Sequence, residues 1–297
     1  MKILVTGGTG FIGQHLITNR LRGGDEIYCY TRDISKVKSI FGESVTPITD
    51  LYTIGKIKID AVVNLAGEPI ADKRWSEGRK KLLRDSRINL TSALVEWIET
   101  LEDKPEVLIS GSAIGYYGSV AGDHKLYESA DVTPGFTHSL CQDWENQALK
   151  AETLGVRVCL IRTGIVLGHG GALDKMYLPF KMGLGGPIGK GNQWMSWVHI
   201  DDEVDVIEML LTHTQLSGVF NLTAPNAVTN REFSKTLGKV LKRPAILQMP
   251  AYAIKLMLGE GAELLLEGQR VYPEKLLEIG YKFKFTELED AMRDIVG

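Results

Sequence analysis

One stretch near the start of the chain decides the fold: Lys2-Ile3-Leu4-Val5-Thr6-Gly7-Gly8-Thr9-Gly10-Phe11-Ile12-Gly13. A strand-like apolar run enters a glycine-rich turn, and the chain leaves that turn as a helix that ends near Gly23-Gly24. Glycines permit the tight turn and let the backbone approach a pyrophosphate, while the helix start offers free N–H groups and a positive dipole end. This motif at a strand-to-helix junction predicts a dinucleotide-binding loop rather than a purely structural turn.

Outward from this loop, short β-branched runs alternate with helical stretches. The expected strands are Lys2–Thr6, Glu26–Thr31, Val45–Ile48, Asp60–Leu65, Glu106–Ser110, Arg157–Arg162 and Gly218–Thr223. The expected helices include Ser86–Leu101, Gln142–Leu154, one that starts at the capping box Thr229-Asn230-Arg231-Glu232, Ala251–Leu258 and Pro273–Ile279. The alternation predicts an α/β Rossmann fold, a doubly wound parallel sheet of right-handed βαβ units. The turn-rich and helical remainder predicts a small, mostly helical C-terminal substrate lobe.

The division into domains follows from the same change of pattern. Residues 1–168 with 196–226 are expected to form the NADP-binding Rossmann domain. Residues 169–195 with 227–297 are expected to form the substrate-binding lobe.

Composition excludes several classes of protein. The 297 residues carry 34 Lys+Arg against 37 Asp+Glu, a net charge of −3 that disfavours a nucleic-acid partner. No uncharged apolar stretch approaches the roughly 20 residues of a spanning helix, and a strand-like run starts the chain without a preceding signal peptide, so no membrane partner is expected. The three cysteines form no CxxC pair and favour a reducing cytoplasm, and the six histidines lack metal-ligand spacing. The remaining partner is a small-molecule substrate, with a monomer or a homodimer left open.

The choice of cofactor is expected at the end of the second strand. An NAD enzyme usually places an acidic residue there for the ribose 2′-OH. Here Thr31 takes that position, and Arg32 beside it could pair with a 2′-phosphate through a charge-assisted fork. Asp33 is interpreted as the N-cap of the next helix. The pattern predicts NADP(H); a merely solvated Arg32 is the alternative.

Several motifs occur in a fixed order along nearly the whole chain. They are Thr6–Gly13, Asn64-Leu65-Ala66-Gly67, Ser110–Gly118 and His199-Ile200-Asp201-Asp202. With them the chain resembles the extended short-chain dehydrogenase/reductases. Arg74-Trp75, Gly183–Gly189 and Leu266–Val271 narrow the resemblance to the atypical branch of epimerase family proteins, also described as nucleoside-diphosphate-sugar epimerases. The resemblance implies a Rossmann fold, bound NADP(H) and a C-terminal substrate lobe.

The loop, the second strand and the resemblance together give a set of candidate cofactor-binding residues. They are Gly7, Thr9, Gly10, Phe11, Ile12, Gly13, Thr31, Arg32, Asp50, Leu51, Leu65, Ala66, Gly67, Arg87, Gly164 and Val166. Of these, Asp50 and Leu51 resemble an adenine-contacting pair. Arg87 could bring a cation to the cofactor or lie on a solvated face.

The catalytic residues depart from the family pattern. Extended members carry a Ser, a Tyr that acts as general acid/base, and a Lys at i+4 from the Tyr that lowers its pKa. The Ser maps to Ser112, whereas the YxxxK position falls on Cys141 and Glu145. Three interpretations remain: Tyr116 or Tyr117 supplies the proton beside Ser112, Cys141 acts as a thiolate, or the site does not catalyse. A tyrosine without the lysine is expected to keep its reference pKa of about 10.

Other residues have two readings each. His199 and Asp201 could face the substrate, although Asp201 is better interpreted as a helix N-cap. Met176, Phe180, Trp194 and Trp197 could line an apolar pocket or belong to the core.

The sequence therefore predicts an NADP(H)-dependent oxidoreductase or epimerase-like enzyme that acts on a small hydroxyl or carbonyl substrate, nucleotide sugars included. The alternative is a weakly active or inactive NADP(H)-binding protein with a regulatory, redox-sensing role.

Overall fold

A central sheet organises the molecule. In a computed structural model that describes residues 1–55, 57–120 and 122–296, seven parallel strands stand in the order β10-β6-β5-β4-β1-β2-β3. Their bounds are β1 (Lys2–Thr6), β2 (Glu26–Tyr30), β3 (Val45–Ile48), β4 (Ala61–Asn64), β5 (Val107–Ala113), β6 (Arg157–Thr163) and β10 (Gly218–Leu222). The predicted doubly wound parallel sheet is confirmed. The strand order reverses between β1 and β4, the switch point where open α/β sheets bind ligands.

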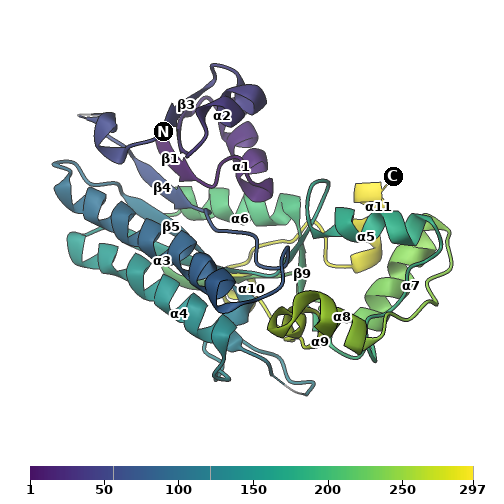
Figure 1. Ribbon diagram of the computed structural model, residues 1–297. Helices are drawn as coiled ribbons and strands as arrows, with labels where there is room; N and C mark the ends of the chain where they lie inside the picture. The colour runs from purple at the N-terminus through teal and green to yellow at the C-terminus, as the bar shows by residue number, and fades with distance from the viewer. Residues whose placement is uncertain (56, 121, 297) are drawn as a thin grey trace.

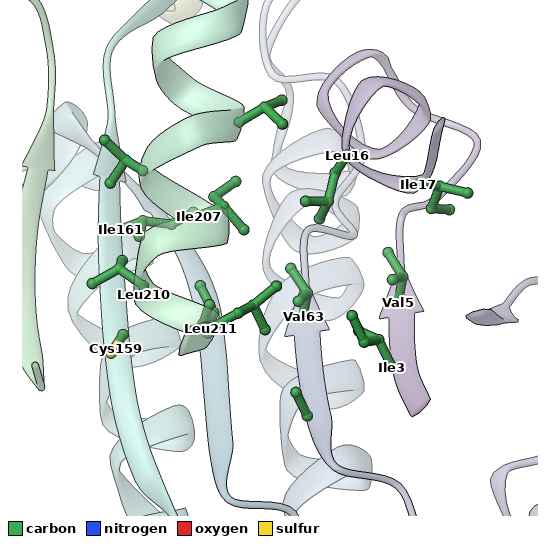
Figure 2. Close-up of a cluster of buried hydrophobic side chains, with 14 of the residues drawn as sticks. Ile3, Val5, Leu16, Ile17, Val63, Cys159, Ile161, Ile207, Leu210 and Leu211 are labelled. Carbon is green, nitrogen blue, oxygen red and sulfur yellow. The ribbon is translucent and has the colours of Figure 1, made fainter. Parts of the chain in front are cut away.

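Helices cover both faces of this sheet (Figure 1). On one face, α1 (Phe11–Arg22) packs beside α6 (Ile200–Thr212), and α2 (Ile34–Phe41) joins the same core through Val37. Figure 2 shows Leu16 and Ile17 of α1 over β1, and side chains of α6 over the neighbouring strands. On the other face lie α3 (Glu77–Thr100) and α4 (Phe136–Leu149), which contact each other.

Successive side chains of a strand point to opposite faces of the sheet, so each strand contributes to both hydrophobic layers. In β1, Ile3 and Val5 belong to the α1 and α6 layer, and Leu4 points to the opposite layer with Trp97 and Ile98 of α3. The apolar stripe that predicted a helix over residues 86–101 is thus confirmed as core, although α3 begins nine residues earlier, at Glu77 behind the N-cap Ser76.

The C-terminal part is mainly helical. Its helices are α5 (Ala172–Lys181), α7 (Asn230–Leu241), α8 (Ala251–Leu258), α9 (Glu263–Leu266), α10 (Glu274–Glu278) and α11 (Leu288–Val296). Two small ladders join it to the sheet: β7 (Ile165–Leu167) pairs with β9 (Trp197–His199), and β8 (Trp194–Met195) pairs with β11 (Val228–Thr229). The predicted capping box is present, since Thr229 and Glu232 bond reciprocally at the start of α7.

A separate apolar core holds α5, α7 and α11 together. Phe180 and Trp197 are buried in it with Phe233 and Met292, so these two aromatic residues are core rather than pocket lining. Part of the predicted substrate lobe lies elsewhere: Leu276 of α10 is fully buried in the core of the main sheet, and Tyr281 packs against that core. The two-domain division itself stays a prediction.

The start of α6 differs from the sequence-based prediction. His199 is the N-cap, and its Nδ1 accepts the backbone N–H of Asp201 at 3.2 Å. The interpretation of Asp201 as the N-cap is therefore wrong, because Asp201 already lies inside the first helical turn. Across the described residues, no helix is long and apolar enough to cross a membrane.

Candidate cofactor and active site

The turn between β1 and α1 forms a cradle made of backbone. Gly7 has φ +69°, and a Cβ on it would lie 2.6 Å from the carbonyl carbon of Leu65. A Cβ on Gly13 would lie 2.4 Å from the Gly7 carbonyl oxygen. Glycine is therefore required at both positions by close backbone approach, and at Gly7 also by a left-handed backbone conformation.

The first turn of α1 is suited to an anion. Its N-cap is the exposed Gly10, which supplies no side-chain cap, and no acidic residue lies in the first turn. The first N–H groups of a helix have no intrahelical partners, and the helix dipole places partial positive charge there. These features fit the pyrophosphate of a dinucleotide.

A buried polar chain ties β1 to β4 beneath this turn. The Thr6 hydroxyl donates to the Asn64 side chain at 2.7 Å and accepts the Ala66 backbone N–H at 3.2 Å. The Asn64 amide donates to Thr91 and Ser110. Leu65 and Ala66 are thereby held beside the glycine turn.

Arg32 stands just after β2 with its side chain 92% exposed. Its guanidinium lies 3.5 Å from Glu68, which Arg79 also contacts, at 3.2 Å. One loose contact leaves the guanidinium able to turn to a phosphate. Thr31 is held by its backbone N–H, which donates to Ile48, and Asp33 is the N-cap of α2 with Lys36 N as donor, as predicted.

The remaining candidate cofactor residues are distributed around the same edge. Asp50 caps the short helix η1 (Leu51–Ile54), and Leu51 is buried in the core. Arg87 lies against Gly67, donates to the Glu68 carbonyl at 3.0 Å and covers the Trp144 ring, so it is neither solvated nor free.

Several glycines follow β6, and those at positions 168 and 171 lie near the start of α1. Gly164 approaches the Ser196 carbonyl so closely that a Cβ would lie 2.5 Å away, and Val166 lies in β7. The Phe11 ring packs against Gly168 and Gly171. Thr9 and Ile12 complete the turn, and the Thr9 carbonyl accepts the Gln14 side chain.

Ser112 sits near the carboxyl end of β5 and belongs to a buried charged network. Its hydroxyl donates to Glu145 Oε1 at 2.6 Å. Arg162 on β6 grips the same carboxylate with two hydrogen bonds of 2.9 Å, from Nε and from Nη2. The site thus contains a cation although it lacks the lysine of YxxxK. This cation is Arg162 of the neighbouring strand β6, and it neutralises Glu145.

Strand register brings this network together. Ser112 on β5 and Asn221 on β10 both pair with Arg162, so three polar residues stand abreast on three adjacent strands. The sequence placed Arg162 only in a segment expected to flank the nicotinamide, and it gave no indication that Arg162 and Asn221 join the Ser112 network. The available signal was a charge near the end of the apolar strand run Val158–Ile161, since a buried arginine requires a partner.

The two candidate tyrosines occupy different environments in the short helix η2 (Ile114–Tyr117). Tyr117 is fully buried, donates to Asn221 at 2.6 Å and accepts from Arg162 at 3.1 Å. Burial raises the pKa of Tyr117 to about 12, more than Arg162 lowers it. The expectation of a pKa near 10 is therefore wrong for Tyr117, because burial disfavours the charged phenolate and raises its pKa.

Tyr116 is half-buried and has no hydrogen-bond partner for its hydroxyl among the described residues. The Arg162 guanidinium carbon lies 3.3 Å from its ring centroid, and the His138 ring meets it edge-on. His138 Nδ1 also donates to the Tyr116 carbonyl at 2.6 Å. These contacts hold the Tyr116 ring in place and leave its hydroxyl available for a hydrogen bond to a ligand.

Cys141 is buried on α4 beside this network. Burial, and then the charge of Glu145, raise the pKa of Cys141 to about 12, and Arg87 only partly opposes them. At neutral pH the group is therefore a thiol, which does not support the thiolate interpretation.

A second buried carboxyl lies on the other face of the sheet. Glu203 of α6 is fully buried and accepts the Thr163 hydroxyl at 2.8 Å. Burial raises the pKa of Glu203 to about 8, so the group is mostly neutral at pH 7. Sequence analysis did not single it out, because a glutamate in the first turn of a helix is ordinary. Among the described residues, no group of His, Cys, Asp and Glu could hold a metal ion.

The cradle, the switch point and the polar carboxyl edge define a nucleotide-binding protein of the extended short-chain dehydrogenase/reductase class. The family model described as the NAD dependent epimerase/dehydratase family matches residues 3–223, and one described as a domain of unknown function (DUF1731) matches residues 249–295. The chain belongs to the NAD dependent epimerase/dehydratase family.

Individual relatives sharpen this assignment. The Arabidopsis thaliana protein "Epimerase family protein SDR39U1 homolog, chloroplastic" is 42% identical over 100% of this chain and 87% of its own length. The mouse protein "Epimerase family protein SDR39U1" is 37% identical over the full length of both chains. The crystal structure of human epimerase family protein SDR39U1 (isoform 2) with NADPH superposes with a TM-score of 0.90, at 34% identity over 99% of each chain.

A more distant structure, UDP-glucuronic acid 4-epimerase from Bacillus cereus in complex with UDP-glucuronic acid and NAD, has a TM-score of 0.80 at 19% identity and shares the fold. The resemblance to epimerase family proteins is thereby confirmed.

Proposed function

We propose that this chain is an NADP(H)-dependent oxidoreductase or epimerase-like enzyme that acts on a small hydroxyl or carbonyl substrate, nucleotide sugars included. The observation that carries the proposal is Ser112, which stands at the carboxyl edge of β5, two strands from the glycine cradle. NADP(H), when bound, supplies the hydride or the hydride acceptor. The chain's own residues must then position the substrate oxygen and handle its proton.

NADP(H) rather than NAD(H) is supported by residues of this chain. Thr31 replaces the acidic residue that would read a ribose 2′-OH, and the exposed Arg32 can reach a 2′-phosphate. The NADPH in the human relative's structure agrees with this choice.

The Ser112 hydroxyl can only accept a further hydrogen bond. Its proton is committed to Glu145, so its oxygen lone pairs are left to accept a hydrogen bond from a substrate hydroxyl. The Glu145 charge is balanced by Arg162, which keeps the serine from facing a bare carboxylate. Ser112 is therefore assigned to orient the substrate hydroxyl.

Tyr116 is the proton donor and acceptor in this proposal. Its hydroxyl is available, whereas the Tyr117 hydroxyl is held by Asn221 and Arg162. Arg162 over the Tyr116 ring and His138 at its carbonyl fix the ring in place. Tyr117 is then a structural residue that anchors the guanidinium.

A second function remains, a cofactor-binding regulatory protein that does not turn over. The observation that favours it is that the polar groups of the network already have partners: Ser112, Glu145, Arg162 and Tyr117 are joined to one another by hydrogen bonds.

We also propose the reducing cytoplasm as the location of the protein. This location is supported by the three cysteines, which are all free and buried.

The test is a substrate panel run in both directions: loss of NADPH absorbance with simple aldehydes and ketones, and gain of NADPH absorbance with NADP+ and UDP-glucose or UDP-glucuronic acid. Chromatography of the two UDP-sugars detects epimers, because an epimerase returns the hydride to its substrate and leaves the absorbance unchanged. Tyr116→Phe should lower the rate by about 10²–10⁴-fold, the usual cost of a lost acid/base group. Tyr117→Phe is the matched control, and it should retain the rate. Tight NADPH binding without hydride transfer to any compound would overturn the enzyme assignment in favour of the regulatory one.

A further inference from the structure

The C-terminal part carries a cluster of exposed apolar side chains on α5, on α8 and on the loops beside them. These side chains, the apolar patch, are Leu178, Met182, Leu184, Ile246, Leu247, Met249, Tyr252, Leu256 and Met257. Ile246 is 79% exposed and Leu256 is 73% exposed. Single exposed apolar residues are ordinary, but contiguous groups of them mark interaction surfaces.

Backbone contacts bring the segments that carry the patch together. The Leu247 N–H donates to the Gly185 carbonyl at 3.2 Å, and the Met249 N–H donates to the Pro187 carbonyl at 2.9 Å. Arg243 donates to the Lys181 carbonyl at the end of α5. The segment after α5 and the segment before α8 therefore lie side by side, and α8 continues the same chain. Figure 1 shows α5, α7 and α8 together at one side of the molecule, away from α2 and β3.

The two segments that carry the apolar patch contain cations and no acidic residue, and the nearby Glu260, just after α8, is paired with Lys80. Residues 176–191 and 239–258 contain no Asp or Glu, in a chain whose net charge is −3. Their cations are Lys181, Lys190, Lys239, Lys242, Arg243 and Lys255. Lys239 pairs with Glu289, and among the described residues the other cations have no carboxylate within ion-pair distance. The surface is thus apolar and cationic together.

We propose that the apolar patch docks this protein peripherally onto an anionic lipid membrane. Aliphatic side chains surrounded by lysine suit the boundary between acyl chains and anionic headgroups, where each nearby cation adds attraction. A twofold contact with a second copy would set these cations against themselves. Protein interfaces are enriched in Met and Tyr, which the patch contains, but they are depleted in Lys, and five of the six cations here are lysines. The lysines therefore favour a lipid surface over a protein partner.

This proposal is compatible with the absence of a spanning helix. The sequence analysis predicts no membrane partner because no stretch could cross a bilayer, and none of the described helices could. Peripheral binding needs only a few apolar side chains inserted at the surface of the bilayer and the attraction of lysines to anionic headgroups. It therefore changes the partner expected for this chain without changing its fold.

The experiment is flotation of the full chain with vesicles made of equal parts phosphatidylglycerol and phosphatidylcholine, and with vesicles of phosphatidylcholine alone. The chain should float with the anionic vesicles, and about 0.5 M salt should release it because salt screens the headgroup charge. Ile246→Ser with Leu256→Ser should weaken binding about tenfold or more, through lost burial of two aliphatic side chains. Lys181→Glu with Lys255→Glu should weaken it as well.

Tyr52→Ser is the matched control, since Tyr52 is 63% exposed but lies in η1, outside the apolar patch. It should float like the parent, and all variants should keep the parent's melting temperature and NADPH affinity, which separates this test from the proposed function. No flotation with either vesicle would overturn the proposal. So would a concentration-dependent dimer that the Ile246 and Leu256 changes abolish while vesicle binding is absent, because the patch would then belong to a second copy.

Discussion

The cofactor cradle and the Ser112 network lie at the same edge of one sheet and are built in opposite ways. The cradle, residues 6–13, is contiguous, offers its backbone to a ligand, and has no side-chain cap at the start of α1 among the described residues. The network joins Ser112, Glu145, Arg162 and Asn221 from separate elements and pairs its own charges. The first region can therefore bind an anion without preorganised side chains, whereas the second offers a substrate only what the network leaves free.

That difference predicts different sensitivities. A cradle that binds through its backbone should fail chiefly through steric contact, when a side chain is added at one of its glycines. A buried charged network should fail through loss of one partner, because an unpaired buried charge costs more than the pair contributes. The following changes separate the two regions.

The largest expected effect on stability is that of Glu145→Ala. Removal of this carboxylate leaves the Arg162 guanidinium buried and unpaired, which should cost about 3–5 kcal/mol in the free energy of unfolding. Urea denaturation measures it. Asp85→Ala, which breaks the exposed Lys81–Asp85 pair, is the control and should cost less than about 1 kcal/mol. A loss as small as that of the control would mean that Arg162 is not the partner that holds Glu145.

Next in size is Arg32→Ala, which acts on the cofactor region alone. Loss of a charge-assisted contact to the 2′-phosphate should weaken NADPH binding by about 1.5–3 kcal/mol and leave NADH nearly unchanged. Titration followed by tryptophan fluorescence gives both affinities. Lys36→Ala removes a nearby exposed cation of α2 and should change neither. Equal weakening of both cofactors would remove Arg32 from 2′-phosphate recognition.

Gly13→Ala tests the steric account of the cradle. The added methyl group would meet the Gly7 carbonyl oxygen, so the turn must shift, at a cost of about 1–3 kcal/mol in stability together with weaker binding of both cofactors. Gly78→Ala is matched to it, because a Cβ on Gly78 within α3 has no heavy atom within 4 Å. That change should leave stability equal or raise it by up to about 1 kcal/mol. Similar behaviour of the two variants would contradict a close-packed cradle.

The smallest effect is expected at Cys141. Because burial raises its pKa to about 12, the native thiol should resist iodoacetamide from pH 7 to pH 9. Mass spectrometry should find no alkylation at Cys141 before unfolding and alkylation after it. Cys141→Ala should keep most of any turnover. Rapid alkylation at pH 7, or loss of turnover in this variant while Tyr116→Phe stays active, would move the chemistry to the thiol.

The two regions also differ in how far the sequence could predict them. The cradle depends on local order along the chain, so its glycines, the Asp33 cap and the cofactor strand could be predicted from spacing. The same holds for the alternation that specifies the parallel sheet. Ser112 could be placed because the family resemblance maps the serine to it, two residues after the predicted strand Glu106–Ser110.

The partners of Ser112 could not be predicted from spacing. Arg162 stands beside Ser112 through the register of β5 and β6, and Asn221 stands beside Arg162 through the register of β6 and β10. No local pattern in the sequence encodes register. A glutamate at the lysine position therefore indicated an uncompensated negative charge, whereas the fold compensates it. His199 replaced Asp201 as the cap for a related reason: histidine is an uncommon N-cap, and only the observed backbone shows its ring nitrogen at the helix start.

The most direct test of the account is a parallel titration of the unmodified protein with NADPH and NADH, followed by tryptophan fluorescence. If the cradle binds the dinucleotide and Arg32 reads its 2′-phosphate, NADPH should bind more tightly by about 10- to 150-fold, the equivalent of 1.5–3 kcal/mol. Equal affinities, or tighter binding of NADH, would contradict it.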